Sequence, residues 1–235
     1  MSLSAVNLAA NSATSVTTVV TEEAWIEDHA NDANAAAAVA SSALKRLFDV
    51  VLSAFALMFF LPVLLVAAVA IKLDSAGPVL FRQRRTGLNG QVFWIFKLRT
   101  MRVQEDGADI KHAAKNDDRI TRVGGLLRKT SVDELPQLFN VLKGDMSMIG
   151  PRPHALSHDQ RYEALVSGYG DRFRARPGLT GLAQVEGHRG EIHTIGCMEK
   201  RVASDNAYIE RWSIGLDIAI LLRTVPLVLR DPNAY

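Results

Sequence analysis

The sequence predicts a mixed α/β, helix-rich protein that carries one membrane-embedded helical segment. Three observations support this prediction. Residues 50–71 contain no charged side chain, residues 78–99 resemble two strands joined by an Asn-Gly turn, and several helical patterns follow. At 235 residues the chain is long enough for one substantial domain with an appendage. We divide it into an acidic tail (1–44), a membrane segment (45–73) and a larger domain (74–235).

Charge is distributed unevenly along the chain. Residues 1–44 are rich in Ala, Ser, Thr and Asn and carry five acidic side chains with no Lys or Arg, so we expect a mobile tail with a frayed helix near residues 34–44. The remainder carries a net charge of +7, which suits anionic partners such as nucleotide phosphates, lipid headgroups or nucleic acid. The single cysteine, Cys197, excludes an internal disulfide and fits a reducing compartment.

The apolar segment at residues 50–71 admits two membrane topologies. As a straight helix it would extend about 33 Å, enough to cross a hydrocarbon core of about 30 Å. Pro62 lies just past its middle, and a proline inside a helix commonly produces a kink. The two arms could therefore enter and leave the same leaflet. The residues alone favour neither topology, and both place the basic domain in the cytoplasm.

Downstream of this segment the patterns alternate between strands and helices. Residues 78–83 and 91–99 are predicted strands, residues 131–143 and 155–167 predicted helices, and residues 177–181 a turn. Residues 205–230 form a helical pattern whose apolar face is interrupted by Asp217 and Arg223. This pattern is typical both of an amphipathic helix in the membrane interface and of a core-packing helix, and both interpretations stay open.

Adjacent carboxylates at Asp133 and Glu134 are the first candidate functional residues. Ser131 followed three residues later by Glu134 is also a capping-box pattern, so both acids could simply begin a helix. Neighbouring carboxylates are, however, natural ligands for a Mg²⁺ ion that holds substrate phosphates, and a carboxylate flanked by cations can attack phosphorus. Seven basic residues around the pair supply such cations: Lys97, Arg99, Arg102, Arg119, Arg122, Arg128 and Lys129.

Arg152 is the second candidate, because it lies between Pro151 and Pro153. The two prolines fix the backbone, and a rigidly presented guanidinium suits bidentate binding of phosphate. A structural turn with a salt-bridged arginine is the equally weighted alternative.

Eight ordered motifs resemble the bacterial sugar transferases, also called small monotopic phosphoglycosyl transferases. The resemblance covers about four-fifths of the chain. Its motifs are KRLFD at 45–49, GPVLF at 77–81, FKLRTMR at 96–102, NDDRIT at 116–121, the Asp-Glu segment, GPRP at 150–153, RPGLTGLAQ at 176–184 and YIERWS at 208–213. The chain departs from common family patterns at Leu61, Asp118 and Leu182, where we expect altered loops rather than lost chemistry.

The resemblance implies a cytoplasmic catalytic domain that transfers a sugar 1-phosphate from a UDP-sugar to undecaprenyl phosphate and releases UMP. Asp133 would be the nucleophile that forms a phosphosugar intermediate, and Glu134 would help it to hold Mg²⁺. Phosphate binding is assigned to Lys97, Arg99, Arg152 and Arg176. The implied membrane element is a re-entrant helix-break-helix with its break at Pro62.

The resemblance also implies location and partners. The expected setting is the cytoplasmic face of the bacterial inner membrane, with membrane lipid as a partner, no nucleic acid, and a homodimer left open. Motifs at 187–191 and 231–235 most resemble the glucose phosphotransferases of exopolysaccharide synthesis, so glucose is the favoured sugar and galactose the next. The chain resembles the minimal form of the family, without a further N-terminal membrane domain. The alternative is a non-catalytic, membrane-tethered module that binds anionic lipid or nucleic acid. That module would need aromatic platforms, for which Phe93, Trp94 and Phe96 are the only cluster.

Overall fold

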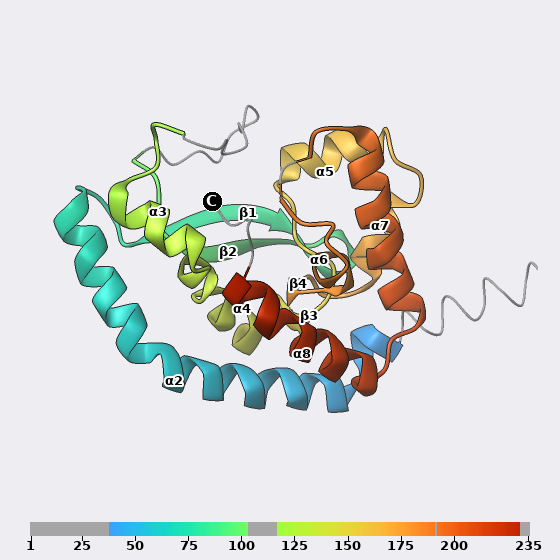
Figure 1. Ribbon diagram of the computed structural model, residues 1–235. Coiled ribbons are helices and arrows are strands. Elements are labelled where there is room, and N and C mark those ends of the chain that lie inside the picture. Colours follow the sequence, from blue (N-terminus) through green and yellow to red (C-terminus); the bar gives the residue numbers. More distant parts are fainter. Residues whose placement is uncertain (1–37, 103–116, 191, 231–235) are drawn as a thin grey trace, which may run out of the picture.

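The computed structural model describes residues 38–102, 117–190 and 192–230, so all but residues 38–44 of the tail predicted at 1–44 lies outside the described residues. A long bent helix, α2 (Ala43–Asp74), runs along one side of the molecule with α8 (Ile214–Arg230) near it (Figure 1). A β-hairpin lies above them, and α5 (Leu156–Glu163) and α7 (Ile195–Glu210) pack at one end. The fold is mixed α/β and rich in helix, as the sequence predicts.

The apolar segment forms a single 32-residue helix, long and apolar enough to cross a membrane. Ser42 caps its first turn by accepting a hydrogen bond from the Lys45 N–H at 3.2 Å. The helix changes direction partway along its length, and Pro62 lies inside it (Figure 1). We attribute the bend to Pro62, because a proline removes a backbone hydrogen bond and its ring clashes with the preceding turn.

The Asn-Gly hairpin is confirmed. Strands β1 (Leu80–Thr86) and β2 (Val92–Leu98) pair antiparallel, with Leu80 opposite Leu98. The connecting turn η1 (Leu88–Gly90) contains Asn89 with φ 54° and Gly90 with φ 75°. Asn and Gly tolerate this left-handed backbone, so the turn forms at little steric cost.

A second sheet occupies a segment that the sequence predicts as a turn. Strand β4 (Gly178–Thr180) pairs parallel with β3 (Ser147–Ile149), so the prediction of a turn at residues 177–181 is wrong. A Cβ at Gly178 would lie 2.1 Å from the backbone nitrogen of Gly150, and only glycine permits that approach. The glycine marks close strand contact here rather than a turn.

The predicted helices at residues 131–143 and 205–230 are each divided into two shorter elements. Residues 131–143 divide into the 3₁₀ turn η2 (Val132–Glu134) and α4 (Gln137–Lys143). Residues 205–230 divide between α7 and α8 at Arg211–Ser213. The other described elements are α3 (Arg122–Lys129), η3 (Tyr169–Arg174) and α6 (Leu182–Val185).

The core-packing interpretation of residues 205–230 holds for one face of α8, and the interfacial interpretation stays a prediction. Ile220 is fully buried in the main core, together with Leu138, Val141, Ile149 and Tyr208. Other apolar side chains of α8 are about half exposed or more: Ile218, Leu222 and Val225. The helix therefore packs on the core along one face and presents apolar side chains outward along another.

A buried polar network fixes the start of α2 to the rest of the protein. Lys45 donates from Nζ to Oδ2 of Asp217 at 2.8 Å, and both side chains are at most 5% exposed. Tyr208 donates from its hydroxyl to Oδ1 of Asp217 at 2.8 Å. Asp49, one turn along α2, accepts the Ser147 hydroxyl at 3.0 Å. The first turns of α2 are therefore anchored by charge and hydrogen bonds rather than by apolar packing alone.

Lys45→Met should destabilise the protein strongly, because it leaves the carboxylate of Asp217 buried without its cation. We expect a loss of about 3–5 kcal/mol, seen as a Tm lower by roughly 6–20 °C in detergent. Lys143→Met is the control, since Lys143 pairs with Asp145 at the surface with 65% of its side chain exposed. It should cost under about 1 kcal/mol. Equal Tm changes in the two variants would contradict this role for Lys45.

Candidate active site

The Asp-Glu pair lies in a tight backbone turn and does not begin a regular helix. Ser131 precedes it with φ 56°, a left-handed conformation, and makes no capping hydrogen bond. The capping-box interpretation of Ser131 and Glu134 is therefore wrong. Asp133 and Glu134 occupy η2, between the end of α3 and the start of α4.

Glu134 is clamped by two cations from distant parts of the chain. Its Oε1 accepts from Nζ of Lys97 at 2.8 Å and from Nη2 of Arg152 at 2.5 Å. Its Oε2 accepts from Nη1 of Arg152 at 3.3 Å. Burial alone would raise the pKa of Glu134, but Arg152 and Lys97 outweigh it and hold that pKa well below its ordinary value. Glu134 is therefore ionised at neutral pH.

Asp133 is buried, with 8% of its surface exposed, and no hydrogen bond reaches its side chain from any residue that the structure describes. Burial raises its pKa to about 6, opposed by Lys97 and reinforced by the charge of Glu134. The two carboxylates therefore differ. Glu134 is held in ion pairs, whereas Asp133 accepts no hydrogen bond from the described residues, although the charges of Lys97, Arg128 and Arg152 act on it. A carboxylate in this state is suited to react or to bind a ligand.

Asn140 aligns the pair with Lys97, and the sequence patterns did not identify it. Its side-chain amide donates to the carbonyl of Trp94 at 2.7 Å, and its Oδ1 accepts the Phe96 N–H at 3.0 Å. Asn140 is fully buried in α4. It ties α4 to the edge of β2, so Lys97 on β2 is held opposite Glu134 just before α4.

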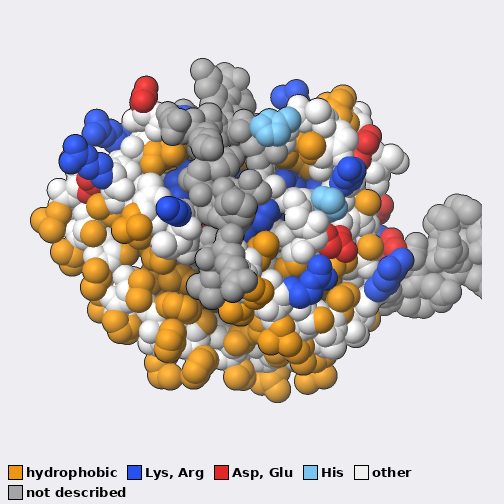
Figure 2. Space-filling view, viewed as in Figure 1, with side chains coloured by type: hydrophobic (Ala, Val, Ile, Leu, Met, Phe, Trp, Pro, Cys, Tyr) orange, Lys and Arg blue, Asp and Glu red, His pale blue; other side chains and the backbone are white. Residues whose placement is uncertain are grey.

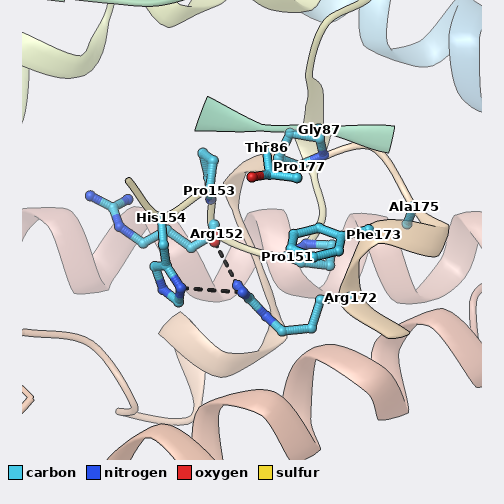
Figure 3. Close-up of a pocket in the computed structure, with 10 residues that line it drawn as sticks. All are labelled: Thr86, Gly87, Pro151, Arg152, Pro153, His154, Arg172, Phe173, Ala175 and Pro177. Atoms are coloured by element: carbon cyan, nitrogen blue, oxygen red, sulfur yellow. Dashed lines mark hydrogen bonds between the residues drawn. The ribbon is translucent and has the colours of Figure 1, made fainter. Parts of the chain in front are cut away.

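Arg152 is positioned through its backbone. Nη2 of Arg172 donates to the carbonyl of Arg152 at 2.6 Å, and Nη1 of Arg172 lies 3.2 Å from Nδ1 of His154 (Figure 3). Arg172 is itself paired with Asp205 of α7 at 2.8 Å. A small, partly open pocket adjoins this segment, lined by Thr86, Gly87, Pro151, Arg152, Pro153, His154, Arg172, Phe173, Ala175 and Pro177. The prolines and Arg172 together hold Arg152 where it meets Glu134.

Next to His154 lies a second buried polar chain that the sequence patterns missed. The Tyr169 hydroxyl donates to Oδ1 of Asp159 at 2.6 Å and lies 2.7 Å from Nδ1 of His154. Thr86 donates to Oδ2 of Asp159 at 2.6 Å. These contacts join β1, α5 and η3 beneath the Pro-Arg-Pro segment, and no local spacing in the sequence indicates them.

Of the sequence-predicted site residues, the structure brings together Asp133, Glu134, Lys97 and Arg152. Arg99 instead donates to the carbonyls of Ser75 and Ala76, where α2 ends. Arg176 donates to the carbonyls of Ala40 and Gly144. In this structure both arginines bind backbone, and phosphate binding by them stays a prediction. Pro62 lies within the apolar helix, as expected.

The pair fits a Mg²⁺ ion that relies largely on its substrate for ligands. Among the described residues there is no cluster of three or more metal-binding side chains. Asp133 offers a buried carboxylate without a hydrogen bond, whereas both oxygens of Glu134 are occupied by Lys97 and Arg152. Mg²⁺ usually binds one or two carboxylates together with substrate phosphates and waters, so Asp133 is the stronger candidate ligand and Glu134 the weaker one.

The chain matches a known protein family over most of its length. The family model described as bacterial sugar transferase matches residues 40–231. A UDP-glucose:undecaprenyl-phosphate glucose-1-phosphate transferase from Caulobacter vibrioides is 56% identical over 84% of this chain and 74% of its own length. A protein with the same description from Escherichia coli K12 is 49% identical over 77% of this chain. The exopolysaccharide production protein PSS of Rhizobium leguminosarum is 47% identical over 77% of this chain and 93% of its own.

The share of each relative that the chain covers differs. It spans 39% of the E. coli protein and 40% of a Xanthomonas campestris protein that carries the same description and is 52% identical. For those relatives the similarity therefore concerns a part of a longer protein.

Asp133→Asn and Glu134→Gln should change stability in opposite directions. A carboxyl whose folded pKa is raised to about 6 contributes stability at low pH that is lost as pH rises through that value, so at about pH 7.5 Asp133→Asn should stabilise by about 1–3 kcal/mol. Glu134→Gln leaves Lys97 and Arg152 without their shared carboxylate, and should destabilise by about 2–4 kcal/mol. Tm measured in detergent tests both. A lower Tm for Asp133→Asn at that pH would show that its carboxylate is better compensated than its contacts indicate.

Proposed function

The chain belongs to the bacterial sugar transferase family, and from that premise we propose that it transfers glucose 1-phosphate from UDP-glucose to undecaprenyl phosphate. This transfer would be the first step in the synthesis of an exopolysaccharide, in keeping with the description of the Rhizobium relative. The observation that carries the proposal is the difference between the two carboxylates. Glu134 is held by Lys97 and Arg152, and Asp133 beside it is buried without a hydrogen bond from the described residues.

The proposed reaction has two displacements at one phosphorus atom. An oxygen of Asp133 forms a bond to the sugar-bearing phosphorus, the bond to the oxygen that bridges the two phosphates breaks, and UMP leaves with that oxygen. A phosphate oxygen of undecaprenyl phosphate then attacks the same phosphorus, and Asp133 leaves as a carboxylate. Covalent catalysis of this kind replaces one difficult step by two easier ones.

Lys97 and Arg152 would place positive charge where the transferred phosphate develops negative charge. Lys97 is about one-fifth and Arg152 about one-third exposed, so both can reach a ligand while they bind Glu134. A bound Mg²⁺, held by Asp133 and secondarily Glu134, would supply charge neutralisation to the diphosphate. Glucose is the proposed donor sugar, and galactose is the next to test.

We further propose that α2 enters and leaves the same membrane leaflet, on the cytoplasmic face of the bacterial inner membrane. Hydrophobic side chains cover the edge of the molecule formed by α2 and α8 (Figure 2). Twelve large hydrophobic side chains of α2 are between 42% and 83% exposed: Leu44, Leu47, Val51, Phe55, Met58, Phe59, Leu61, Val63, Leu65, Val66, Val69 and Leu73. These side chains suit contact with acyl chains.

Contacts at both ends of α2 support the re-entrant topology over a span. At the start, Lys45 is paired with Asp217 of the main domain. At the end, Asp74 accepts the Val123 N–H of α3 at 3.1 Å, and Arg99 of the hairpin region donates to the Ser75 carbonyl at 2.6 Å. A spanning helix would separate its ends by the membrane thickness of about 30 Å, and one domain could not then hold both.

Asp133→Asn should abolish transfer, because an amide cannot form the phosphosugar intermediate. We expect UMP release from UDP-glucose, with undecaprenyl phosphate and Mg²⁺, to fall by roughly 10³-fold or more. Asp171→Asn, at a half-exposed aspartate that pairs with Arg174, is the control and should retain activity. If the wild-type protein releases no UMP from UDP-glucose or UDP-galactose, the proposed function is wrong.

Single cysteines at Ala43 and Ala76, each in a Cys197→Ser background, should be labelled from the same side of sealed vesicles. Both alanines are exposed; Ala43 is the first residue of α2, and Ala76 lies two residues beyond its end. A membrane-impermeant maleimide applied to inside-out and right-side-out vesicles makes the measurement. Labelling of the two positions from opposite sides would establish a membrane span.

A further inference from the structure

His154 is enclosed by arginines from three elements. Nη1 of Arg172 lies 3.2 Å from its Nδ1, and Nη1 of Arg201 lies 3.5 Å from its Nε2. Arg152 precedes it by two residues. Burial, followed by the charges of Arg172 and Arg201, lowers the pKa of His154 well below its ordinary value. The imidazole is therefore neutral and contributes no charge to the cluster.

Two of these arginines have a carboxylate within hydrogen-bond distance, and Arg201 does not. Arg172 is paired with Asp205 at 2.8 Å, and Arg152 is paired with Glu134. Arg201 donates instead to the carbonyls of His188 and Gly190, at 2.9 and 3.2 Å. Within the described ranges no carboxylate lies within 4.0 Å of its guanidinium. Asp205 is one turn further along α7 but already binds Arg172.

Arg201 is 7% exposed, so its charge is largely removed from water. Burial, and then the charge of Arg152, lowers its pKa to about 10, which leaves it protonated at neutral pH. A buried cation that contacts two carbonyl oxygens and a neutral imidazole, but no carboxylate, is poorly compensated. The described residues therefore supply no anion for Arg201, and the arginine cluster has room in its charge balance for one more.

We propose that Arg201 binds a phosphate group of the substrates, next to the phosphate that Arg152 and Lys97 hold at the Asp-Glu pair. This inference rests on the proposed function. The guanidinium of Arg152 and the imidazole of His154 extend to the same side of the Pro-Arg-Pro segment, with Pro151 and Phe173 on the other (Figure 3). Because Arg201 contacts His154, an anion bound to it lies on the side that Arg152 faces.

The phosphate that fits best belongs to the nucleotide rather than to the lipid. Arg201 is in the first half of α7, and the second half of that helix leads to α8. The apolar surface lies on α2 and α8, and α7 extends away from it (Figure 1). A lipid phosphate enters from the apolar side, and the leaving nucleoside monophosphate departs from the other. Arg201 would therefore stabilise the phosphate of UMP as its bond to the transferred phosphorus breaks.

Arg201→Gln tests the proposal, because glutamine can still donate to a carbonyl but carries no charge. In the full chain in detergent, we expect affinity for UMP, measured by titration calorimetry, to fall about tenfold or more, and affinity for uridine to be unchanged. Arg201→Lys should bind UMP within about threefold of wild type. The Tm of ligand-free Arg201→Gln should be equal to or above that of wild type, since a poorly compensated charge is removed. Arg174→Gln, at a more exposed arginine, is the control.

Three outcomes would overturn the proposal: wild-type protein that does not bind UMP, Arg201→Gln that binds UMP within about twofold of wild type, or equal losses for UMP and uridine. Loss of binding to a short-chain polyprenyl phosphate, with UMP binding intact, would assign Arg201 to the acceptor and contradict its role toward UMP. Transfer by the wild-type protein is measured separately. Normal transfer with unchanged UMP binding in Arg201→Gln rejects this inference alone, and UMP binding without transfer rejects the proposed function alone.

Discussion

The ion pairs of Glu134 with Lys97 and Arg152 are the interaction on which the rest of the site depends. They join three separate segments: strand β2, the turn η2 and the Pro-Arg-Pro segment. These ion pairs also determine which of the two carboxylates ionises more easily, because two adjacent buried carboxylates do not ionise with equal ease. Glu134 holds the cations and is ionised, so Asp133 is the carboxylate left with a raised pKa and no hydrogen bond from the described residues. The division of roles follows from that asymmetry.

A second constraint comes from the apolar helix. Its outer side chains require an apolar environment, and its two ends are fixed to the main domain by Lys45, Asp74 and the contacts of Arg99. In the reaction that we propose, a lipid phosphate reaches the site from this apolar surface and meets a soluble nucleotide there. We assign Arg201 of α7 to the nucleotide, because α7 extends away from the apolar surface (Figure 1).

Local patterns in the sequence predicted the hairpin, the apolar segment with its proline, and the Asp133-Glu134 pair with Arg152 as candidate site residues. These features depend on neighbouring residues, such as Asn89-Gly90 or Pro151-Arg152-Pro153, so they can be recognised one segment at a time. Partners that are distant in sequence could not be found this way. Arg172 and Asp205 are 33 residues apart, and Lys45 and Asp217 are 172 apart. Backbone conformation and close strand packing were equally hidden, so Ser131, with φ 56°, looked like a helix cap, and Gly178, packed against Gly150, looked like a turn.

The central claim is that Asp133 forms a covalent bond to the sugar phosphate. The most direct measurement is mass spectrometry of the protein quenched after reaction with UDP-glucose and Mg²⁺ in the absence of undecaprenyl phosphate. The account predicts a gain of one hexose phosphate on the peptide that contains Asp133, and its loss when the acceptor is added. An adduct on another residue, or product formation without any adduct, would contradict it.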